Sequence, residues 1–188
     1  AYLNELLVAE IYPSFCLVMH NSGSGIAAGQ VPSGFYEKLP NLSDLDRSLV
    51  GRWLDLELDV PLIDILKQHG ISFTSVETGT INCDAVRGCL EARREKLFVF
   101  SGFGGNIVSS SILSLDMKFL HIHGGYVPAF KGSTTNYYSL LAEGQLGASA
   151  IFLTEDLDSG PVWHRQKFPR PDDPELIDYF IDPGLRAR

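Results

Sequence analysis

The sequence predicts one α/β domain of Rossmann-like architecture, with a mostly parallel sheet, helices on both faces and a C-terminal hairpin. Short apolar runs of strand length alternate with segments of helical periodicity, which is the pattern of parallel sheets covered by helices. The chain has 188 residues, close to the size of one domain. A hydrophobic share of 45% and a charged share of 20% are ordinary for a folded protein. We therefore expect a single domain spanning 1–188.

The first elements are expected to be a helix, a strand and a long loop. The apolar positions of Tyr2–Ala9 follow a helical pattern, and Phe15–Met19 is a compact apolar run of strand length. Residues 20–45 are rich in Gly, Pro, Ser and Asn without apolar periodicity, which predicts a loop. The chain has no initiator Met and stops abruptly after Arg188, so both ends are expected to be cuts within a longer protein.

The next elements alternate regularly. Val60–Pro61 opens a helix that Gly70 is expected to end as a C-terminal stop. A strand over Ile71–Val76 follows, and Asn82 is expected to cap a helix that runs to about Arg94.

The second half of the chain places two glycine-rich loops after strands. We first expect a strand at Leu97–Phe100, a helix near Asn106–Leu113 and a strand at Lys118–Ile122. A helix from Thr134 or Thr135 to Glu143 should follow. The chain should end with two strands, at Ala148–Leu153 and Pro161–Phe168, and a helix from Asp172 or Asp173 through Phe180. Ligands of open α/β sheets bind beyond the carboxyl ends of the strands. The glycine-rich segments after Phe100 and His123 therefore lie where a binding site is expected.

Charge and cysteine content exclude several classes of protein. Lys and Arg total 15 against 23 Asp and Glu, giving a formal net charge of −8, so we expect no nucleic-acid partner. The densest basic cluster, at 87–96, is interrupted by Glu91 and Glu95 and is expected to be a solvated helix face. No apolar run approaches the ~20 residues that cross a bilayer. Three cysteines without a CxxC motif fit a reducing compartment, so we expect a cytoplasmic protein.

Two histidines and one aspartate are the candidate chemical groups. His121 and His123 lie at a strand end, and the period of a strand puts both imidazoles on the same face. Gly124–Gly125 follows them, which indicates that the backbone must approach another group closely. Asp158 lies in an Asp-Ser-Gly turn before the last strand, a sequence that also suits a simple turn.

The segments around these residues resemble the catalytic domain of the folate-dependent formyltransferases, a group that includes the glycinamide ribonucleotide, methionyl-tRNA and sugar N-formyltransferases. The matching segments are His121–Pro128, Lys131–Gly132, Gly147–Ser149 and Asp158–Gly160, and Phe100–Val108 resembles the loop that lines the folate pocket. The resemblance covers about Leu97–Phe168, and before that only the order of strands and helices agrees. Members of this group usually begin with a strand before the first helix of this chain, so the resemblance implies that this strand is missing here.

The resemblance implies transfer of a formyl group from 10-formyltetrahydrofolate to a primary amine of a small molecule, such as an amino sugar nucleotide. It implies catalytic roles for His121, His123 and Asp158 without a metal ion. The residues expected to bind the folate are Phe103, Gly104, Gly105, Asn106, Ile107, Glu155 and Leu157. Those expected to bind the acceptor are Gly124, Gly125, Lys131, Ser133 and Thr134, although Ser133, Thr134 or Thr135 equally suits the cap of the next helix.

The sequence departs from the group at His121, where relatives have an Asn whose amide donates to the formyl oxygen. An imidazole N–H can also donate, so His121 is expected to share this role with His123, while Asp158 orients His123. The Pro-Ser pair of many relatives is replaced by Gly124–Gly125, which implies a reshaped acceptor pocket.

Two other classes of function remain open at this point. A His-x-His pair with a distant Asp also suits a metal-dependent hydrolase that uses His121, His123 and Asp158 as ligands. The substitution at His121 also suits a non-catalytic binding domain with a formyltransferase-like fold.

Overall fold

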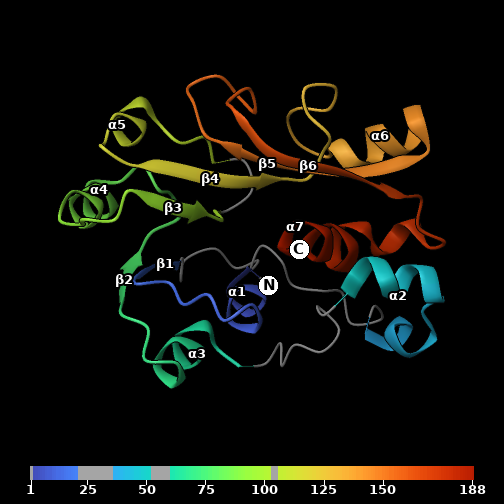
Figure 1. Ribbon diagram of the computed structural model, residues 1–188, viewed down its shortest axis with the longest axis horizontal. Helices are drawn as coiled ribbons and strands as arrows, with labels where there is room; N and C mark the ends of the chain where they lie inside the picture. Colours follow the sequence, from blue (N-terminus) through green and yellow to red (C-terminus); the bar gives the residue numbers. More distant parts are fainter. Residues whose placement is uncertain (1, 21–35, 52–59, 103–105) are drawn as a thin grey trace.

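The computed structural model describes residues 2–20, 36–51, 60–102 and 106–188. Its strands form two sheets (Figure 1). In the first, β1 (Cys16–His20) pairs in parallel with β2 (Phe73–Glu77). The second has the order β3 (Leu97–Phe100), β4 (Lys118–His123), β5 (Gln145–Phe152), β6 (Val162–Pro169). The α/β class is confirmed, and so is the antiparallel hairpin formed by β5 and β6.

The strands differ from the expected single sheet in two respects. β1 and β3 are not hydrogen-bonded to each other, so the parallel pairs β1–β2 and β3–β4 belong to separate sheets. β5 runs antiparallel to β4 as well as to β6. The loop after β4 and the helix that follows return the chain to the end of the sheet where β4 finishes, which sets the direction of β5.

The helices surround the four-stranded sheet and the small sheet. They are α1 (Tyr2–Val8), α2 (Asp44–Val50), α3 (Leu62–Gln68), α4 (Asp84–Glu91), α5 (Ser110–Leu113), α6 (Thr135–Glu143) and α7 (Asp182–Ala187), with the 3₁₀ helices η1 (Tyr36–Asn41) and η3 (Pro174–Leu176) and a π-helix η4 (Ile177–Ile181). In the view of Figure 1, α2 and α7 lie below the four-stranded sheet and α6 lies above its right-hand end.

The expected long loop is partly helical. Residues 21–35 lie outside the described residues, but the rest of the stretch forms η1 and begins α2. The Ser43 hydroxyl accepts the main-chain N–H of Asp46 at 3.1 Å and so caps α2. The loop prediction was wrong there because helices this short leave no apolar period to read.

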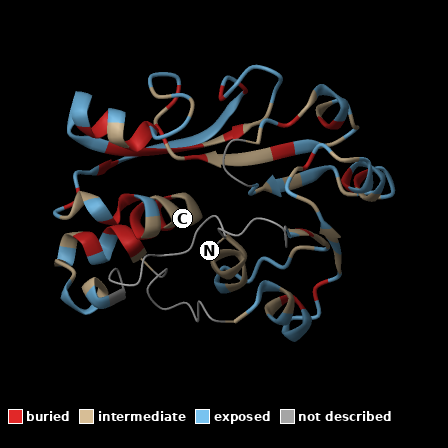
Figure 2. Cartoon of the chain, turned by 180° about the vertical axis from the view of Figure 1, so that it is seen from behind, coloured by how far each residue is buried: buried red, intermediate tan, exposed pale blue. Residues whose placement is uncertain are grey.

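Buried residues gather on β5 and on the helices below it (Figure 2), and most of the buried residues are apolar. The largest group joins Leu146 and Ala148 of β5 to Leu49 of α2 and to Phe180, which is completely buried. Burial of apolar surface stabilises a fold by about 25 cal/mol for each Å² removed from water. This packing therefore holds η4 and α7 against the sheet.

A second apolar group joins the two sheets through side chains. Leu17 and Met19 of β1 pack against the buried group that includes Phe119 of β4 and Val86 of α4. The sheets therefore share part of the core without sharing a backbone hydrogen bond.

The basic cluster at 87–96 is not one helix face, because α4 ends at Glu91 and not near Arg94, and two of its arginines pair with glutamates. Arg87 pairs with Glu91 at 2.8 Å, and Arg93 pairs with Glu95 at 2.7 Å. In the described ranges, no helix combines the length and the hydropathy needed to span a membrane.

Candidate active site

A cavity of about 500 Å³ lies at the carboxyl ends of β3 and β4. Segments far apart in sequence meet around it: the ends of both strands, the segment after β3, the turn before β6, the start of α6, and α7. Its volume is typical of a small-molecule site, and its place is the one expected for open α/β sheets.

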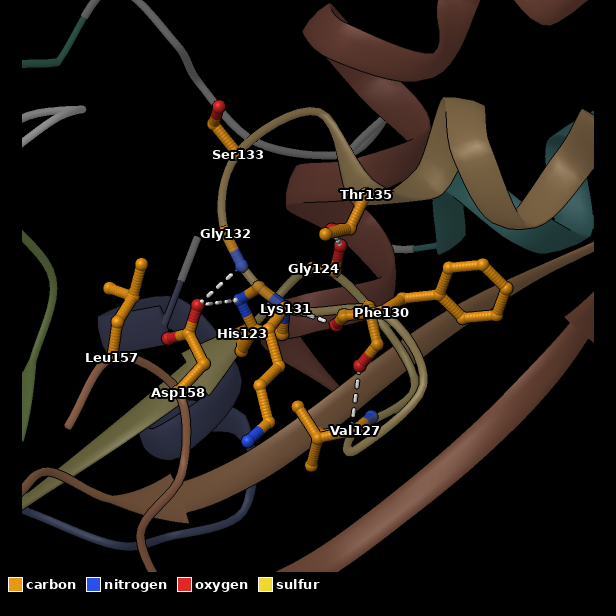
Figure 3. A network of polar contacts seen from close by, with 12 residues as sticks. His123, Gly124, Val127, Phe130, Lys131, Gly132, Ser133, Thr135, Leu157 and Asp158 are labelled. Carbon is orange, nitrogen blue, oxygen red and sulfur yellow. Dashed lines mark hydrogen bonds and ion pairs between the residues drawn. The ribbon is translucent and has the colours of Figure 1, made fainter.

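His123 and Asp158 form a buried pair in the cavity wall (Figure 3). Nδ1 of His123 is 3.5 Å from Oδ2 of Asp158, and that oxygen also accepts the main-chain N–H of Gly132 at 2.8 Å. Nε2 of His123 is 2.9 Å from the carbonyl oxygen of Phe130. Because a carbonyl only accepts, Nε2 carries a proton, and a protonated ring would donate from both nitrogens.

The turn that presents Asp158 is unusual in its backbone. Asp158 has a φ of 47°, in the left-handed region that Asp tolerates better than most residues. Two residues later, a Cβ on Gly160 would collide with the carbonyl oxygen of Phe152. The Asp-Ser-Gly sequence therefore provides more than a turn, since it directs a carboxylate into the cavity at a site where the backbone is tightly packed.

The glycine pair after His123 lets the backbone lie close to other groups of the site on two sides. A Cβ on Gly125 would lie 2.8 Å from Nε2 of His123 and from the carbonyl oxygen of Phe130. A Cβ on Gly124 would meet the carboxylate of Asp182. Side chains at these positions would collide with groups of the site, which explains why both positions are glycine.

His121 lines the same cavity from β4. The register of β3 and β4 places it opposite Phe100, and Nδ1 lies 3.1 Å from the Phe100 carbonyl oxygen. Burial lowers the pKa of His121, and the charges of Arg186 and His123 lower it further, against the opposing effects of the Phe100 carbonyl and Asp158. This lowering of the pKa favours the neutral ring.

The wall contributed by α6 and α7 carries charged and amide groups. Asn136 donates from Nδ2 to Oδ1 of Asp182 at 2.8 Å, and its own oxygen accepts a main-chain N–H of β5. Nε of Arg186 lies 2.9 Å from Oδ2 of Asp182. This wall suits a polar small molecule with hydroxyl or amino groups.

Part of the cavity lining is apolar. Phe100 lines it from the end of β3, and Ile107 and Leu157 expose 61% and 52% of their surface. Large apolar side chains exposed at a cavity are typical of a binding surface for a ring system.

Asn82 fixes the segment that carries Ile107. Its Nδ2 donates to the carbonyl oxygen of Ile107 at 2.8 Å, and its Oδ1 accepts the N–H of Ser109 at 2.8 Å. The prediction that Asn82 caps a helix was wrong, because Cys83 holds the cap position of α4 and the Asn82 amide is engaged with the loop after β3. The same contacts hold the chain extended up to Ser109, so α5 starts later than expected.

Most residues predicted for the site lie around the cavity. Those in its wall are His121, His123, Asp158, Asn106, Ile107, Leu157, Gly124, Ser133 and Thr134. Gly125 packs behind His123, Glu155 is exposed away from the wall, and Lys131 donates to the Ser159 hydroxyl at 2.7 Å. Phe103, Gly104 and Gly105 lie outside the described residues.

The hydroxyl groups at the start of α6 do not cap that helix. Thr134 holds the cap position with a φ of 58° and no side-chain cap bond, and the Thr135 hydroxyl donates to the carbonyl oxygen of Gly124. Ser133 and Thr134 are therefore left exposed at the mouth of the cavity.

Sequence reasoning missed Asp182 and Arg186, which lie near the end of the chain and far in sequence from the histidines. Their spacing of four residues, acidic before basic, is the pattern of an ion pair on a helix and could have drawn attention to them. Nothing in the sequence placed that helix beside the cavity. Across the described residues, no group of three or more His, Cys, Asp or Glu side chains is arranged to hold a metal ion.

Several solved structures with the same fold are formyltransferases. Phosphoribosylglycinamide formyltransferase from Streptococcus pneumoniae TIGR4 has a TM-score of 0.52 and 22% identity over 91% of this chain and 89% of its own. Glycinamide ribonucleotide transformylase 1 from Geobacillus kaustophilus has a TM-score of 0.55 and 17% identity over 92% and 93% of the two chains. A sugar N-formyltransferase from Shewanella sp. FDAARGOS_354 has a TM-score of 0.50 and 12% identity over 92% of this chain and 63% of its own.

No known protein family and no curated protein matches the chain by sequence. The similarity to solved structures extends over nearly the whole of this chain, well beyond the segments that carry the sequence resemblance. The chain therefore has the formyltransferase fold.

Proposed function

We propose that this protein transfers a formyl group from 10-formyltetrahydrofolate to a primary amine of a small molecule. The observation that carries the proposal is the buried His123–Asp158 pair in the wall of a cavity lined by both apolar and polar residues. The shared fold and the matching sequence segments support the same reading. A cavity of about 500 Å³ is large enough for the reacting ends of two substrates.

The described residues fit a folate-type donor. The exposed side chains of Ile107 and Leu157 offer an apolar surface to a flat ring, and the segment held by Asn82 offers main-chain polar groups beside it. When bound, the donor supplies an activated formyl carbon.

Each side chain of the pair has a distinct part in the reaction. His123 stabilises the negative charge that develops on the formyl oxygen and supplies a proton to the departing nitrogen. Donors placed in this way contribute about 3 kcal/mol in other acyl-transfer sites. Asp158 is a positioning residue that holds His123 by its Nδ1 side. In the present conformation Nε2 of His123 donates to Phe130, so this N–H must turn toward the substrate during the reaction.

The acceptor end suits an amine carried by a polar metabolite. Asp178, Asp182 and Arg186 lie in the wall there together with the hydroxyls of Ser133 and Thr134. We infer an amino sugar nucleotide or a similar metabolite as the acceptor, in the cytoplasm and without a nucleic-acid partner.

The geometry gives less support to the two alternatives. A metal-dependent hydrolase needs a set of ligands, and both nitrogens of His123 and one of His121 already face other protein groups. A binding domain that has lost its chemistry would not need a buried imidazole beside a carboxylate.

Calorimetric titration with a 10-formyltetrahydrofolate analogue tests the proposal. We expect saturable binding without added metal, and formylation of at least one member of a panel of amines when the true donor is used. Leu157→Glu, at the exposed apolar wall, should abolish binding of the analogue. Leu141→Glu is the matched control, because Leu141 is 86% exposed on α6 and does not line the cavity.

Other results would favour the alternatives. Zinc binding that is lost in His121→Ala, with no affinity for the analogue, would favour the metal-dependent hydrolase. Binding of the analogue with no transfer to any amine would leave a binding domain.

A further inference from the structure

The orientation of His121 fixes where its proton lies. Nδ1 is 3.1 Å from the carbonyl oxygen of Phe100, with a geometry suited to an N–H donor. A carbonyl oxygen has no hydrogen to give, so Nδ1 must carry one. The pairing of Phe100 with His121 in the β3–β4 ladder keeps these two groups together.

Burial, together with the positive charges nearby, favours the neutral ring of His121. Removal from water lowers the pKa of His121, as do the guanidinium of Arg186 on α7 and the neighbouring His123 on β4. The Phe100 carbonyl on β3 and the carboxylate of Asp158 in the β5–β6 turn act in the opposite direction but do not reverse the shift.

A neutral ring with its proton on Nδ1 has a lone pair on Nε2 and no second N–H. This nitrogen has no hydrogen bond to any described residue, and the side chain lines the cavity. His121 in this form cannot donate to the formyl oxygen in place of the Asn of similar enzymes. It can only accept.

We propose, on the basis of the proposed function, that His121 is a catalytic base that takes a proton from the attacking amine through Nε2. The amine nitrogen forms a bond to the formyl carbon and loses one proton to His121. The bond between that carbon and the donor nitrogen breaks, and the donor nitrogen receives one proton from His123. Solvent returns the proton from His121 to His123, so the amide and the deformylated donor form with no net change in the protein.

The two histidines thus have opposite tasks although one residue separates them. His123 lies 3.5 Å from a carboxylate and suits a proton donor, whereas His121 donates to a main-chain carbonyl and suits an acceptor. Acid and base side by side in different surroundings are a common arrangement for transfer reactions at neutral pH.

His121→Asn is the sharpest test, because it introduces the residue that similar enzymes carry. If His121 is the base, kcat should fall about 100-fold and the acidic limb of the kcat–pH profile should disappear. His164→Asn, at an exposed position on β6, is the matched control and should behave as wild type. Wild-type kcat and an unchanged pH profile in His121→Asn would overturn the proposal and indicate that this position only donates.

A second measurement does not depend on activity. Nitrogen-15 NMR of histidine-labelled protein should show His121 at neutral pH with Nδ1 protonated and Nε2 unprotonated. The signals of His121 are assigned by their absence from the spectrum of His121→Asn. A protonated Nε2 would overturn the proposal. Absence of formyl transfer by the wild-type protein would contradict the proposed function itself, whereas transfer at the wild-type rate in His121→Asn would contradict only the role of His121.

Discussion

Asp158 combines a main-chain contact with a charge contact in one carboxylate. Its Oδ2 accepts the N–H of Gly132 at 2.8 Å and faces Nδ1 of His123 at 3.5 Å. A substitution of Asp158 therefore separates the effect of its charge from the effect of its main-chain contact only if the contact with Gly132 is retained. Asparagine at 158 can keep an acceptor for Gly132 while it removes the charge beside the imidazole.

We expect Asp158→Asn to lower turnover by about 100-fold and to leave affinity for a formylfolate analogue nearly unchanged. The physical reason is that the protonated form of His123 loses its counter-charge while the cavity keeps its shape. Steady-state kinetics with calorimetry measures both quantities, and Asp156→Asn in the exposed part of the same turn is the control. Parallel loss of affinity and turnover would show that Asp158 acts by holding the loop in place.

Among the secondary-structure elements, the C-terminal helices are positioned by a buried carboxylate in addition to their apolar packing. Asp46 of α2 is 2% exposed, and its two oxygens accept the main-chain N–H groups of Asp172 and Asp173 at 2.8 and 3.0 Å. These contacts fix the point where the chain leaves β6 and enters η3. They therefore help to place Arg186 of α7 at the cavity.

Asp46→Ala should lower the free energy of unfolding by about 2 kcal/mol, because it removes the charged acceptor of two partly buried hydrogen bonds from the main-chain N–H groups of Asp172 and Asp173. Urea denaturation measures the loss. Asp44→Ala in the first turn of the same helix is the control, since its exposed carboxylate makes no such contact. An equal loss in both variants would mean that the effect comes from the helix and not from the contacts with 172 and 173.

Elements governed by local chemistry were predictable from the sequence. Gly70 follows α3 with a φ of 64°, which its lack of a side chain allows, and the apolar run Leu97–Phe100 is β3. Asn82 was misread because its partners at 107 and 109 are distant in sequence. Local patterns describe how a segment can fold, whereas contacts of this kind depend on which segments meet.

The same distinction applies to the site. His121 and His123 were identifiable because one strand period puts them on one face, and Asp158 because a motif accompanies it. The proton position on His121 was not identifiable, since it depends on the register that sets Phe100 opposite it.

For the molecule as a whole, the lowered pKa of His121 makes stability depend on pH. The unfolded chain binds a proton at the ordinary histidine pKa, near 6.5, while the folded protein resists protonation until a lower pH. The contribution of His121 is thus fully present above the ordinary value and is lost as pH falls toward the folded value.

Wild-type protein should therefore lose more stability between pH 7.5 and pH 5.5 than His121→Asn does. Urea denaturation of both proteins at the two pH values gives the loss of stability of each. Subtracting one loss from the other cancels the contributions of the titrating groups that the two proteins share. An identical loss in the two proteins would show that folding leaves the affinity of His121 for protons unchanged.

The separation of the two sheets has a consequence for the exchange of amide hydrogens with solvent. Cys16 donates to Ser72 and His20 accepts from Thr78, so the parallel ladder turns the N–H of alternate residues of β1 toward β2. The N–H groups of Leu17 and Met19 point to the other edge, although their side chains are packed in the core. In heavy water these two amides should take up deuterium well before Val18 between them, so that one strand has an alternating pattern of protection.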